Sequence, residues 1–331
     1  MKNHTLSITT KVFTLTFAIS AIALKNAEAD DVTLYKALFG TLPKSAESKD
    51  NPSNPAKIKL GKQLYFEKLL SKNKDLSCNS CHNLETYGVD NQPTSPGHKG
   101  QLGDRNSPTS LNSALHFVQF WDGRAKDVEE QALGPVLNPV EMAMPNEQEV
   151  LTRLKASKEY PNLFKEAFPG EKDPLTFKNV GKAIGAFERT LITPSRFDKY
   201  MNGDSNALND KEKHGLKLFV ETGCNSCHQG PLFGAGMYQK LGLVTPYPTA
   251  HPNDKGRAKI TGQSFDEMVF KVPSLRNVEK TYPYLHDGSI KSLDDAVKIM
   301  AKYQLGKTLD DKQTSDIVAF LKTLTGEKVK Y

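Results

Sequence analysis

The sequence Cys78-Asn79-Ser80-Cys81-His82 is repeated without change at residues 224–228. A Cys-x-x-Cys-His pattern is typical of covalent attachment of c-type haem. Its two thiols add to the vinyl groups of the porphyrin, and its imidazole binds the iron. Because the two copies use all four cysteines of the chain, the sequence predicts two covalently bound haem c groups. The predicted attachment residues are Cys78, Cys81 and His82 for the first haem, and Cys224, Cys227 and His228 for the second.

The four cysteines allow three other interpretations. Two C-x-x-C pairs can hold one zinc ion, they can form disulfides, or one pair can be a redox site. A zinc site does not require His directly after the second Cys, yet His follows both pairs. The pairs also lie 146 positions apart, which is far for one small zinc module. Haem attachment is therefore the favoured interpretation.

The N-terminus has the pattern of a secretory signal peptide. Lys2 and Lys11 precede an apolar run over residues 12–24, and Ala27-Glu28-Ala29 follows as a cleavage sequence. The run is too short for a comfortable membrane span, which needs roughly 20 apolar residues. An uncleaved membrane anchor is the alternative. We expect a signal peptide over residues 1–29, a mature chain without stable membrane insertion and, in bacteria, a periplasmic location.

Composition indicates an ordinary globular protein. Hydrophobic residues make up 37% of the chain and charged residues 25%, and the formal net charge is +6. The lysines are scattered and are not interspersed with aromatic residues, as they are in proteins that bind single-stranded nucleic acid. Nucleic acid is therefore not an expected partner. The length favours two domains.

The two halves of the chain correspond beyond the repeated pentapeptide. Pro108 matches Pro273, and Trp121 matches His286, both at an offset of 165 positions. Strand signals are few, and helical patterns cover residues 179–191 and 310–324. The expected fold is mainly α, with two tandem cytochrome c-like domains, each around one covalent haem and with long loops. We place the N-terminal domain at residues 30–192 and the C-terminal domain at residues 193–331.

The two halves differ in the residue available for the sixth coordination position of the haem iron. The ligand at this position decides whether a haem transfers electrons or catalyses a reaction. Met300 offers a thioether ligand to the second haem, whereas its counterpart in the first half is Pro135, which cannot bind iron. Met237 and Met268 are competing ligands, and Met300 could equally be a core residue of an amphipathic helix. The comparison favours His228 and Met300 as ligands of a high-potential second haem.

Two polar residues of the first half have no counterpart in the second. His98 lies in a loop rich in Pro and Gly, where it is either a displaceable ligand of the first iron or a surface histidine. Glu141 corresponds to Gly306. A carboxylate beside an open haem face can take a proton from one peroxide oxygen and return it to the other. The alternative is a solvated Glu.

The chain resembles the bacterial di-haem cytochrome c peroxidases from Leu34 to Gly326, nearly its whole mature length. Together the matching segments are specific, although only the CNSCH pair would suffice alone. These segments are Cys78–His82, Pro93–His98, Gln119–Arg124, Val140–Met142, Cys224–His228, Pro283–His286 and the region of Met300.

The resemblance implies roles for individual residues. The first haem would be the peroxidatic one, with His82 as proximal and His98 as displaceable distal ligand. Glu141 would be the acid and base, Gln131 and Pro135 would line the peroxide pocket, and Trp121 would lie between the haems. A calcium ion would join the domains, bound by Asn106 and by the backbone oxygens of Thr281 and Pro283, ligands that suit Ca²⁺.

The expected function is reduction of hydrogen peroxide to water with electrons from a small periplasmic redox protein, either a cytochrome c or a copper protein. The family also implies a homodimer. A di-haem electron carrier without catalysis is one alternative. A related di-haem oxidase that acts on a protein substrate is another; that family places Tyr on the second haem, and Tyr303 lies three residues from Met300.

Overall fold

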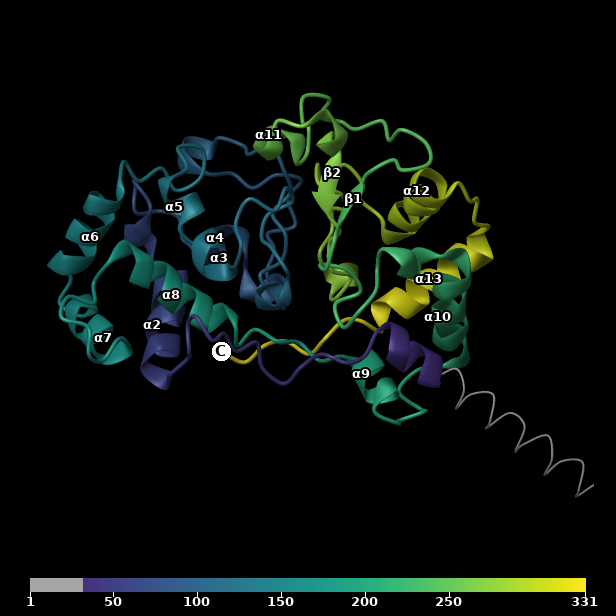
Figure 1. The fold of residues 1–331 in the computed structure, drawn as a ribbon, viewed down its shortest axis with the longest axis horizontal. Coiled ribbons are helices and arrows are strands. Elements are labelled where there is room, and N and C mark those ends of the chain that lie inside the picture. Colours follow the sequence, from purple (N-terminus) through teal and green to yellow (C-terminus); the bar gives the residue numbers. More distant parts are fainter. Residues whose placement is uncertain (1–31) are drawn as a thin grey trace, which may run out of the picture.

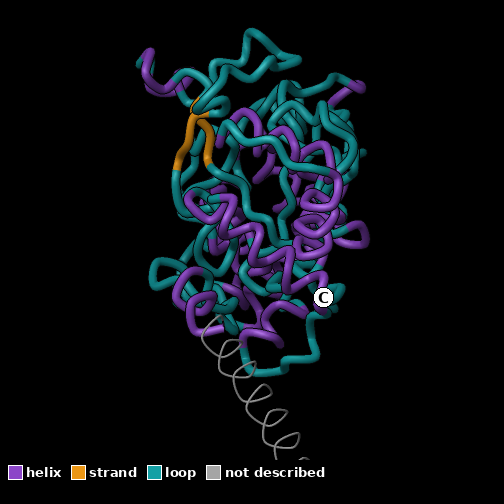
Figure 2. Tube along the Cα trace, turned by 90° about the vertical axis from the view of Figure 1, so that its right-hand side faces the viewer, coloured by secondary structure: helices purple, strands orange, loops and turns teal. Residues whose placement is uncertain are grey.

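A computed structural model describes residues 32–331 and shows two lobes side by side (Figure 1). Helices and long loops make up nearly all of both lobes, and one two-stranded antiparallel sheet is drawn in Figure 2. The sheet pairs β1 (Tyr238–Lys240) with β2 (Val269–Lys271). The expectation of two mostly helical domains with few strands is confirmed.

Two crossed helices organise the first lobe. Helix α2 (Pro55–Tyr65) begins where the Asn54 side chain accepts a hydrogen bond from the Lys57 amide at 2.8 Å, which caps the helix. It packs against α8 (Phe177–Glu188) at Gly61, where a Cβ atom would overlap the carbonyl oxygen of Ala183. Only glycine allows this approach of the two backbones.

The second lobe repeats the same helix crossing. Helix α10 (Asp210–Thr222) meets α13 (Asp311–Lys322) at Gly215, where a Cβ atom would overlap the carbonyl oxygen of Asp316. Both crossings lie beside a buried core. The first core contains Leu60, Leu64, Ile184 and Phe187, and the second contains Leu216, Phe219, Ile317 and Phe320.

Shorter helices complete the two lobes. The first lobe contains α3 (Cys78–Cys81), α4 (Val128–Gln131), α5 (Gly134–Leu137), α6 (Glu147–Ala156) and α7 (Tyr160–Ala167). The second contains α9 (Arg196–Met201), α11 (Ala258–Thr261) and α12 (Leu293–Leu305). Single 3₁₀ turns include η3 (His98–Gly100) and η5 (Cys224–Ser226). None of the helices within residues 32–331 is long and apolar enough to cross a membrane.

A buried threonine joins the two lobes symmetrically. The side-chain amides of Asn112 and Asn277 donate hydrogen bonds to Oγ1 of Thr193 at 2.7 and 3.0 Å. These two asparagines are 165 positions apart, which is the offset of the repeat, and both have a φ near +60°. Thr193 therefore lies where the first half of the repeat passes into the second.

The two ends of the described chain pack against opposite cores. Tyr35 and Phe39 belong to the core of the second lobe, although they precede the first haem motif. Val329 packs against the core of the first lobe, and the Tyr331 hydroxyl donates to Glu85 at 2.8 Å. These short ends depart from the expected assignment of residues 30–192 and 193–331 to separate domains; the boundary near residue 193 remains a prediction. The expected signal peptide, residues 1–29, lies outside the described residues.

Candidate functional site

The first CNSCH motif forms one helical turn that faces a cavity. Ser77 and Ser80 form a capping box at the start of α3, and the thiols of Cys78 and Cys81 are free. Nδ1 of His82 donates a hydrogen bond to the carbonyl oxygen of Pro108 at 2.9 Å. This bond orients the ring and leaves Nε2 as the nitrogen available to a metal.

The second motif holds its histidine in the same way. It follows helix α10 through Gly223, which has a φ of +93°. Nδ1 of His228 donates to the carbonyl oxygen of Phe233 at 2.8 Å, and the thiols of Cys224 and Cys227 are also free. Burial lowers the pKa of both histidines, so each ring is a neutral donor at pH 7. Each lobe therefore offers the two free thiols and the oriented imidazole that covalent attachment of haem c requires.

Two of the other interpretations of the cysteines, a disulfide and a zinc site, are not supported by this geometry. All four thiols are free, so the structure contains neither C-x-x-C disulfide. Across residues 32–331, no group of three or more His, Cys, Asp or Glu side chains is arranged to hold a metal ion. A single zinc site made from both cysteine pairs therefore has no structural support.

A cavity of about 510 Å³ lies beside the first motif, within the size range of small-molecule and cofactor sites. The structure brings most of the predicted residues of the first half together here. Its lining includes Cys78, Cys81, His82, Asn106, Trp121, Gln131, Pro135 and Glu141. Loops and short helices that are separate in the sequence therefore meet around one haem-sized space.

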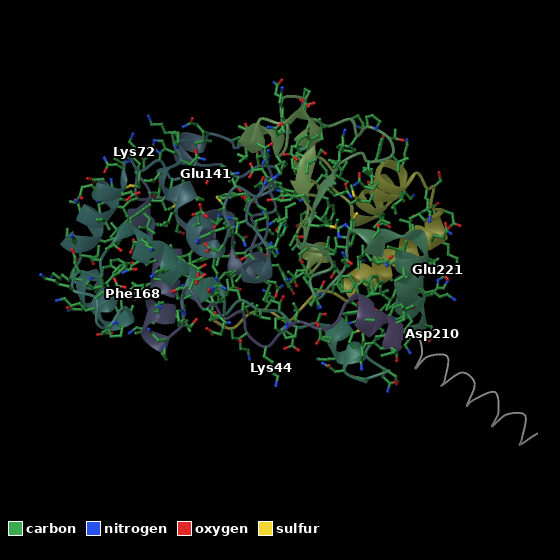
Figure 3. The ribbon with its side chains drawn as sticks, viewed as in Figure 1. Lys44, Lys72, Glu141, Phe168, Asp210 and Glu221 are labelled. Carbon is green, nitrogen blue, oxygen red and sulfur yellow. The ribbon has the colours of Figure 1, made fainter. Side chains whose placement is uncertain are left out.

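Glu141 is a half-buried acid on the wall of this cavity, and Figure 3 labels it in the first lobe. Burial raises the pKa of its carboxyl, although the charge of Arg124 and a hydrogen bond from Asn138 oppose the shift. Nδ2 of Asn138 donates to Oε1 of Glu141 at 2.7 Å. A carboxyl with a raised pKa and a fixed orientation can exchange protons with a ligand in the cavity.

The backbone of His98 is hydrogen-bonded to the segment that contains Glu141, but His98 does not line the cavity. Its amide donates to the carbonyl oxygens of Val140 and Glu141, at 3.0 and 2.7 Å. The residue is buried, which differs from an ordinary surface histidine. Because its side chain is not among the groups that line the cavity, binding of His98 to the first iron remains a prediction.

Trp121 lies where the two lobes meet. Its indole Nε1 donates to the carbonyl oxygen of Asn106 at 2.9 Å, and its own carbonyl accepts a bond from the Lys271 amide of β2 at 2.7 Å. The ring makes edge contacts with Phe270 and His286 of the second lobe, with centroids 6.5 Å away. Trp121 thus lines the first cavity and contacts the second lobe.

The residues predicted to bind calcium lie along the same junction. Nδ2 of Asn106 donates to the carbonyl oxygens of Gln92 and Pro93, so Oδ1 is the side-chain atom left to ligate a cation. Asn91 donates to the carbonyls of Lys280 and Tyr282, the neighbours of Thr281 and Pro283. The two segments are therefore tied together, whereas the calcium ion itself remains a prediction.

Burial does not distinguish among the three methionines considered as ligands of the second iron. Met300 lies within α12 and is half-buried, as are Met237 before β1 and Met268 before β2. The choice of Met300 as the sixth ligand therefore still rests on the internal comparison and the resemblance.

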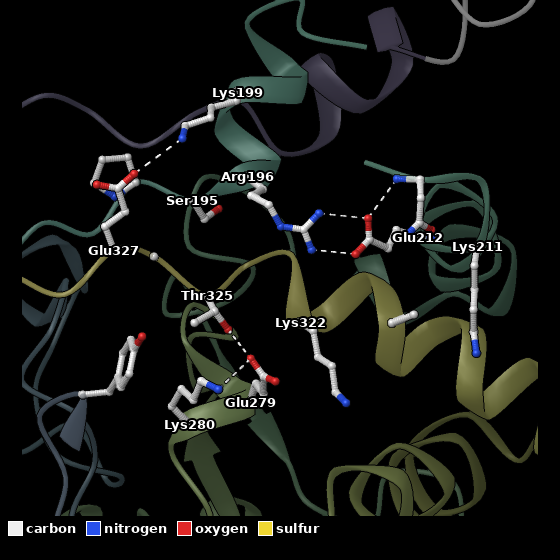
Figure 4. Close-up of a pocket in the computed structure, with 15 residues that line it drawn as sticks. Ser195, Arg196, Lys199, Lys211, Glu212, Glu279, Lys280, Lys322, Thr325 and Glu327 are labelled. Carbon is white, nitrogen blue, oxygen red and sulfur yellow. Dashed lines mark hydrogen bonds and ion pairs between the residues drawn. The ribbon is translucent and has the colours of Figure 1, made fainter. Parts of the chain in front are cut away.

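A second hollow of about 540 Å³ lies at the linker, away from both haem motifs (Figure 4). Several of its charged side chains form ion pairs with one another. Arg196 binds Glu212 at 2.6 Å, Lys199 reaches Glu327 at 3.5 Å, and Lys280 reaches Glu279 at 3.3 Å. This hollow holds none of the residues predicted for the chemistry.

Comparison with known proteins identifies the family. The family model for di-haem cytochrome c peroxidase matches residues 55–206, and that for cytochrome c matches residues 212–325. Cytochrome c551 peroxidase of Nitrosomonas europaea is 49% identical over 84% of this chain and 82% of its own length. The chain belongs to the di-haem cytochrome c peroxidase family. It is therefore a peroxidase-type oxidoreductase with two haem c groups.

Other members of this family show its range. Cytochrome c551 peroxidase of Pseudomonas aeruginosa is 46% identical over 88% of this chain and 85% of its own length. The methylamine utilization protein MauG of Methylorubrum extorquens is 33% identical over 93% of this chain and 89% of its own. The crystal structure of a MauG-like protein associated with microbial copper homeostasis superposes with a TM-score of 0.76 at 29% identity, over 86% of this chain and 94% of that one. The peroxidases are the more similar group.

Sequence reasoning missed Asn138 and Glu188, which both line the first cavity. Asn138, which orients Glu141, lies only three positions before it, and the Asn-Pro-Val-Glu spacing could have suggested the contact. Glu188 lies at the end of α8, and its side chain also lines the cavity. Its position within a helical pattern gave no sign that an acid faces the haem space.

Proposed function

We propose that this protein reduces hydrogen peroxide to two waters in the bacterial periplasm, with two electrons from a small cytochrome c or copper protein. The observation that carries the proposal is the placement of Glu141, an acid with a raised pKa, on the wall of the cavity that also contains Cys78, Cys81 and His82. Similarity to cytochrome c551 peroxidases supports the same activity.

The first lobe would carry out the chemistry. When bound, the haem supplies an iron that takes up peroxide and exchanges electrons with it. Cys78 and Cys81 hold the group, and His82 is fixed as its ligand by the carbonyl oxygen of Pro108. Glu141 would accept a proton from the nearer peroxide oxygen and return it to the leaving oxygen, while Gln131 and Pro135 shape the pocket.

The second lobe would receive electrons. His228 and Met300 are the proposed ligands of its haem, and a thioether ligand raises the potential of haem iron. Trp121 lines the first cavity and contacts the second lobe through Phe270 and His286, which supports a position between the haems. We assign residues 30–192 mainly to the peroxidatic domain and residues 193–331 mainly to the electron-entry domain.

Four further assignments belong to the proposal. Residues 1–29 are a signal peptide, and the mature protein forms a homodimer. His98 is a displaceable ligand of the first iron. A calcium ion binds Asn106 together with the backbone oxygens of Thr281 and Pro283; the ties from Asn91 to the neighbouring carbonyls support this placement.

Peroxide turnover tests the proposed function. The holoenzyme is mixed with hydrogen peroxide and a reduced small cytochrome c, both as isolated and after one-electron reduction, and donor oxidation is followed. We expect two donor molecules to be oxidised per peroxide. If neither form turns over peroxide with a cytochrome or a copper-protein donor, an electron carrier without catalysis becomes the better account.

A further inference from the structure

Glu188 is a second carboxylic acid in the first haem cavity. It is the last residue of α8 and is only 6% exposed, yet its side chain lines the same cavity as Cys78 and His82. Among residues 32–331 no group donates a hydrogen bond to its carboxyl, whereas Glu141 has Asn138. A buried carboxyl without a donor is poorly stabilised in its charged form.

The second lobe has an apolar residue at the equivalent position. The helix crossings align Ala183 with Asp316 and Phe187 with Phe320, because these pairs contact Gly61 and Gly215 in the same way. The residue after Phe187 is Glu188, and the residue after Phe320 is Leu321, which is 3% exposed in the core. The acid is therefore a feature of the first haem site and not of the shared fold.

The charges around Glu188 favour its neutral form. Burial and, to a lesser degree, the charge of Glu129 on α4 raise the pKa of Glu188, Arg189 opposes them, and the net result is a pKa of about 8. Arg189 is itself engaged by Glu129 through hydrogen bonds of 2.9 and 2.8 Å. The other titratable groups facing this carboxyl are Tyr65 of α2 and Cys78 of α3. None of them supplies a free positive charge.

We propose that Glu188 binds a proton when the first haem is reduced and releases it when that haem is oxidised. A carboxylate inside a cavity of low polarity stabilises the ferric over the ferrous charge state, and the ferric charge in turn favours the carboxylate. One-electron reduction of that haem is thus accompanied by uptake of one proton from solvent on the carboxyl oxygen. The net charge of the cavity stays constant as the electron arrives.

This coupling deepens the proposed function, since it rests on the first cavity holding the peroxidatic haem. Glu141 would move protons between peroxide oxygens, whereas Glu188 would adjust the driving force for electron arrival. The two acids lie in one cavity but act on different steps. Replacing Glu188 should therefore change the potential of the first haem without removing the acid that serves peroxide.

A redox titration of the holoenzyme at several pH values tests the proposal without any turnover. At a fixed applied potential, the ratio of ferric to ferrous first haem should change about tenfold per pH unit between the two pKa values of Glu188. That ratio should be nearly constant over the same pH range in Glu188→Gln and in Glu188→Leu. The second variant introduces the residue type of Leu321, which occupies the equivalent position in the second lobe. The matched control Glu141→Gln should keep the tenfold dependence.

Two results would overturn the proposal: an unchanged tenfold dependence in both Glu188 variants, or its loss in Glu141→Gln with retention in Glu188→Gln. The second haem is an internal reference, because its titration should be the same in wild type and variants. Failure here is distinguishable from failure of the proposed function. If the wild-type protein reduces no peroxide, but the Glu188→Gln variant still loses the pH dependence of the first haem, the proposed function fails and the proton coupling stands.

Discussion

Nδ2 of Asn138 donates a 2.7 Å hydrogen bond to Oε1 of Glu141, and this contact orients an acid on the wall of the first haem cavity. Such a bond stabilises the carboxylate, whereas burial disfavours it. The balance leaves Glu141 with a raised pKa, which suits a group that must both accept and return a proton.

Replacement of Glu141 by Gln should lower peroxide turnover by about 10²–10⁴-fold, the usual contribution of a positioned acid and base. Gln keeps the size of the side chain but cannot take a proton. Steady-state oxidation of a reduced cytochrome donor measures the effect, with haem content checked by absorbance. Glu147→Gln, at an exposed position, is the matched control. Turnover within threefold of wild type in Glu141→Gln would remove Glu141 from the mechanism.

The pH dependence of kcat/KM should also reflect the ionisation of Glu141. Because Glu141 must be ionised to accept the first proton, kcat/KM should fall as the pH decreases through its pKa. Burial raises that pKa, so the acidic limb should lie above the usual range of a Glu side chain. Measurement of kcat/KM between pH 4 and 8 checks this expectation. An acidic limb that persists unchanged in Glu141→Gln would have to come from another group.

Met300→His should lower the potential of the second haem and leave that of the first unchanged, because a thioether ligand raises the potential of haem iron relative to a second imidazole. Potentiometric titration followed in the visible region separates the two haems. Met237→Leu and Met268→Leu are the controls, since both residues are half-buried in the same lobe. A shift of the second haem in either control, with none in Met300→His, would assign the ligand differently.

The glycine at each helix crossing should be essential for stability. Alanine at Gly61 or Gly215 would place a methyl group on the carbonyl oxygen of Ala183 or Asp316, and overpacking of this kind costs about 1–3 kcal/mol of the free energy of unfolding or more. Gly236→Ala is the control, because the nearest heavy atom to a Cβ atom there lies 4.0 Å away. Urea unfolding of the holoenzymes measures the difference. Equal midpoints for Gly61→Ala and Gly236→Ala would show that the helices accommodate the methyl group without loss of stability.

The internal repeat explains why the sequence predicts much of this fold. The CNSCH pair and the offset of 165 positions indicate two related helical units, and Asn112 and Asn277 keep that offset in their contacts with Thr193. The helical patterns over 179–191 and 310–324 correspond to α8 and α13 within a few residues. Periodic apolar positions with clear caps are the strongest local signals, so these elements follow from the sequence.

Contacts between distant segments could not be predicted in this way. Glu188 lines the cavity at the end of α8, which packs against the distant helix α2, and no local sequence pattern encodes that packing. Tyr35 packs in the second core because the chain crosses between the lobes before the first motif. The position of His98 depends on a loop held by the carbonyl oxygens of Val140 and Glu141. Tertiary packing decides all three.

In the proposed division of roles, the first lobe binds peroxide and the second receives electrons. Titration of the holoenzyme with one electron equivalent, followed by addition of peroxide or a small exogenous ligand under spectroscopic observation, tests it most directly. We expect the electron to reside on the haem attached at Cys224 and Cys227, and only the haem attached at Cys78 and Cys81 to bind the added ligand. Ligand binding at the second haem, or at neither haem together with no peroxide consumption, would contradict it.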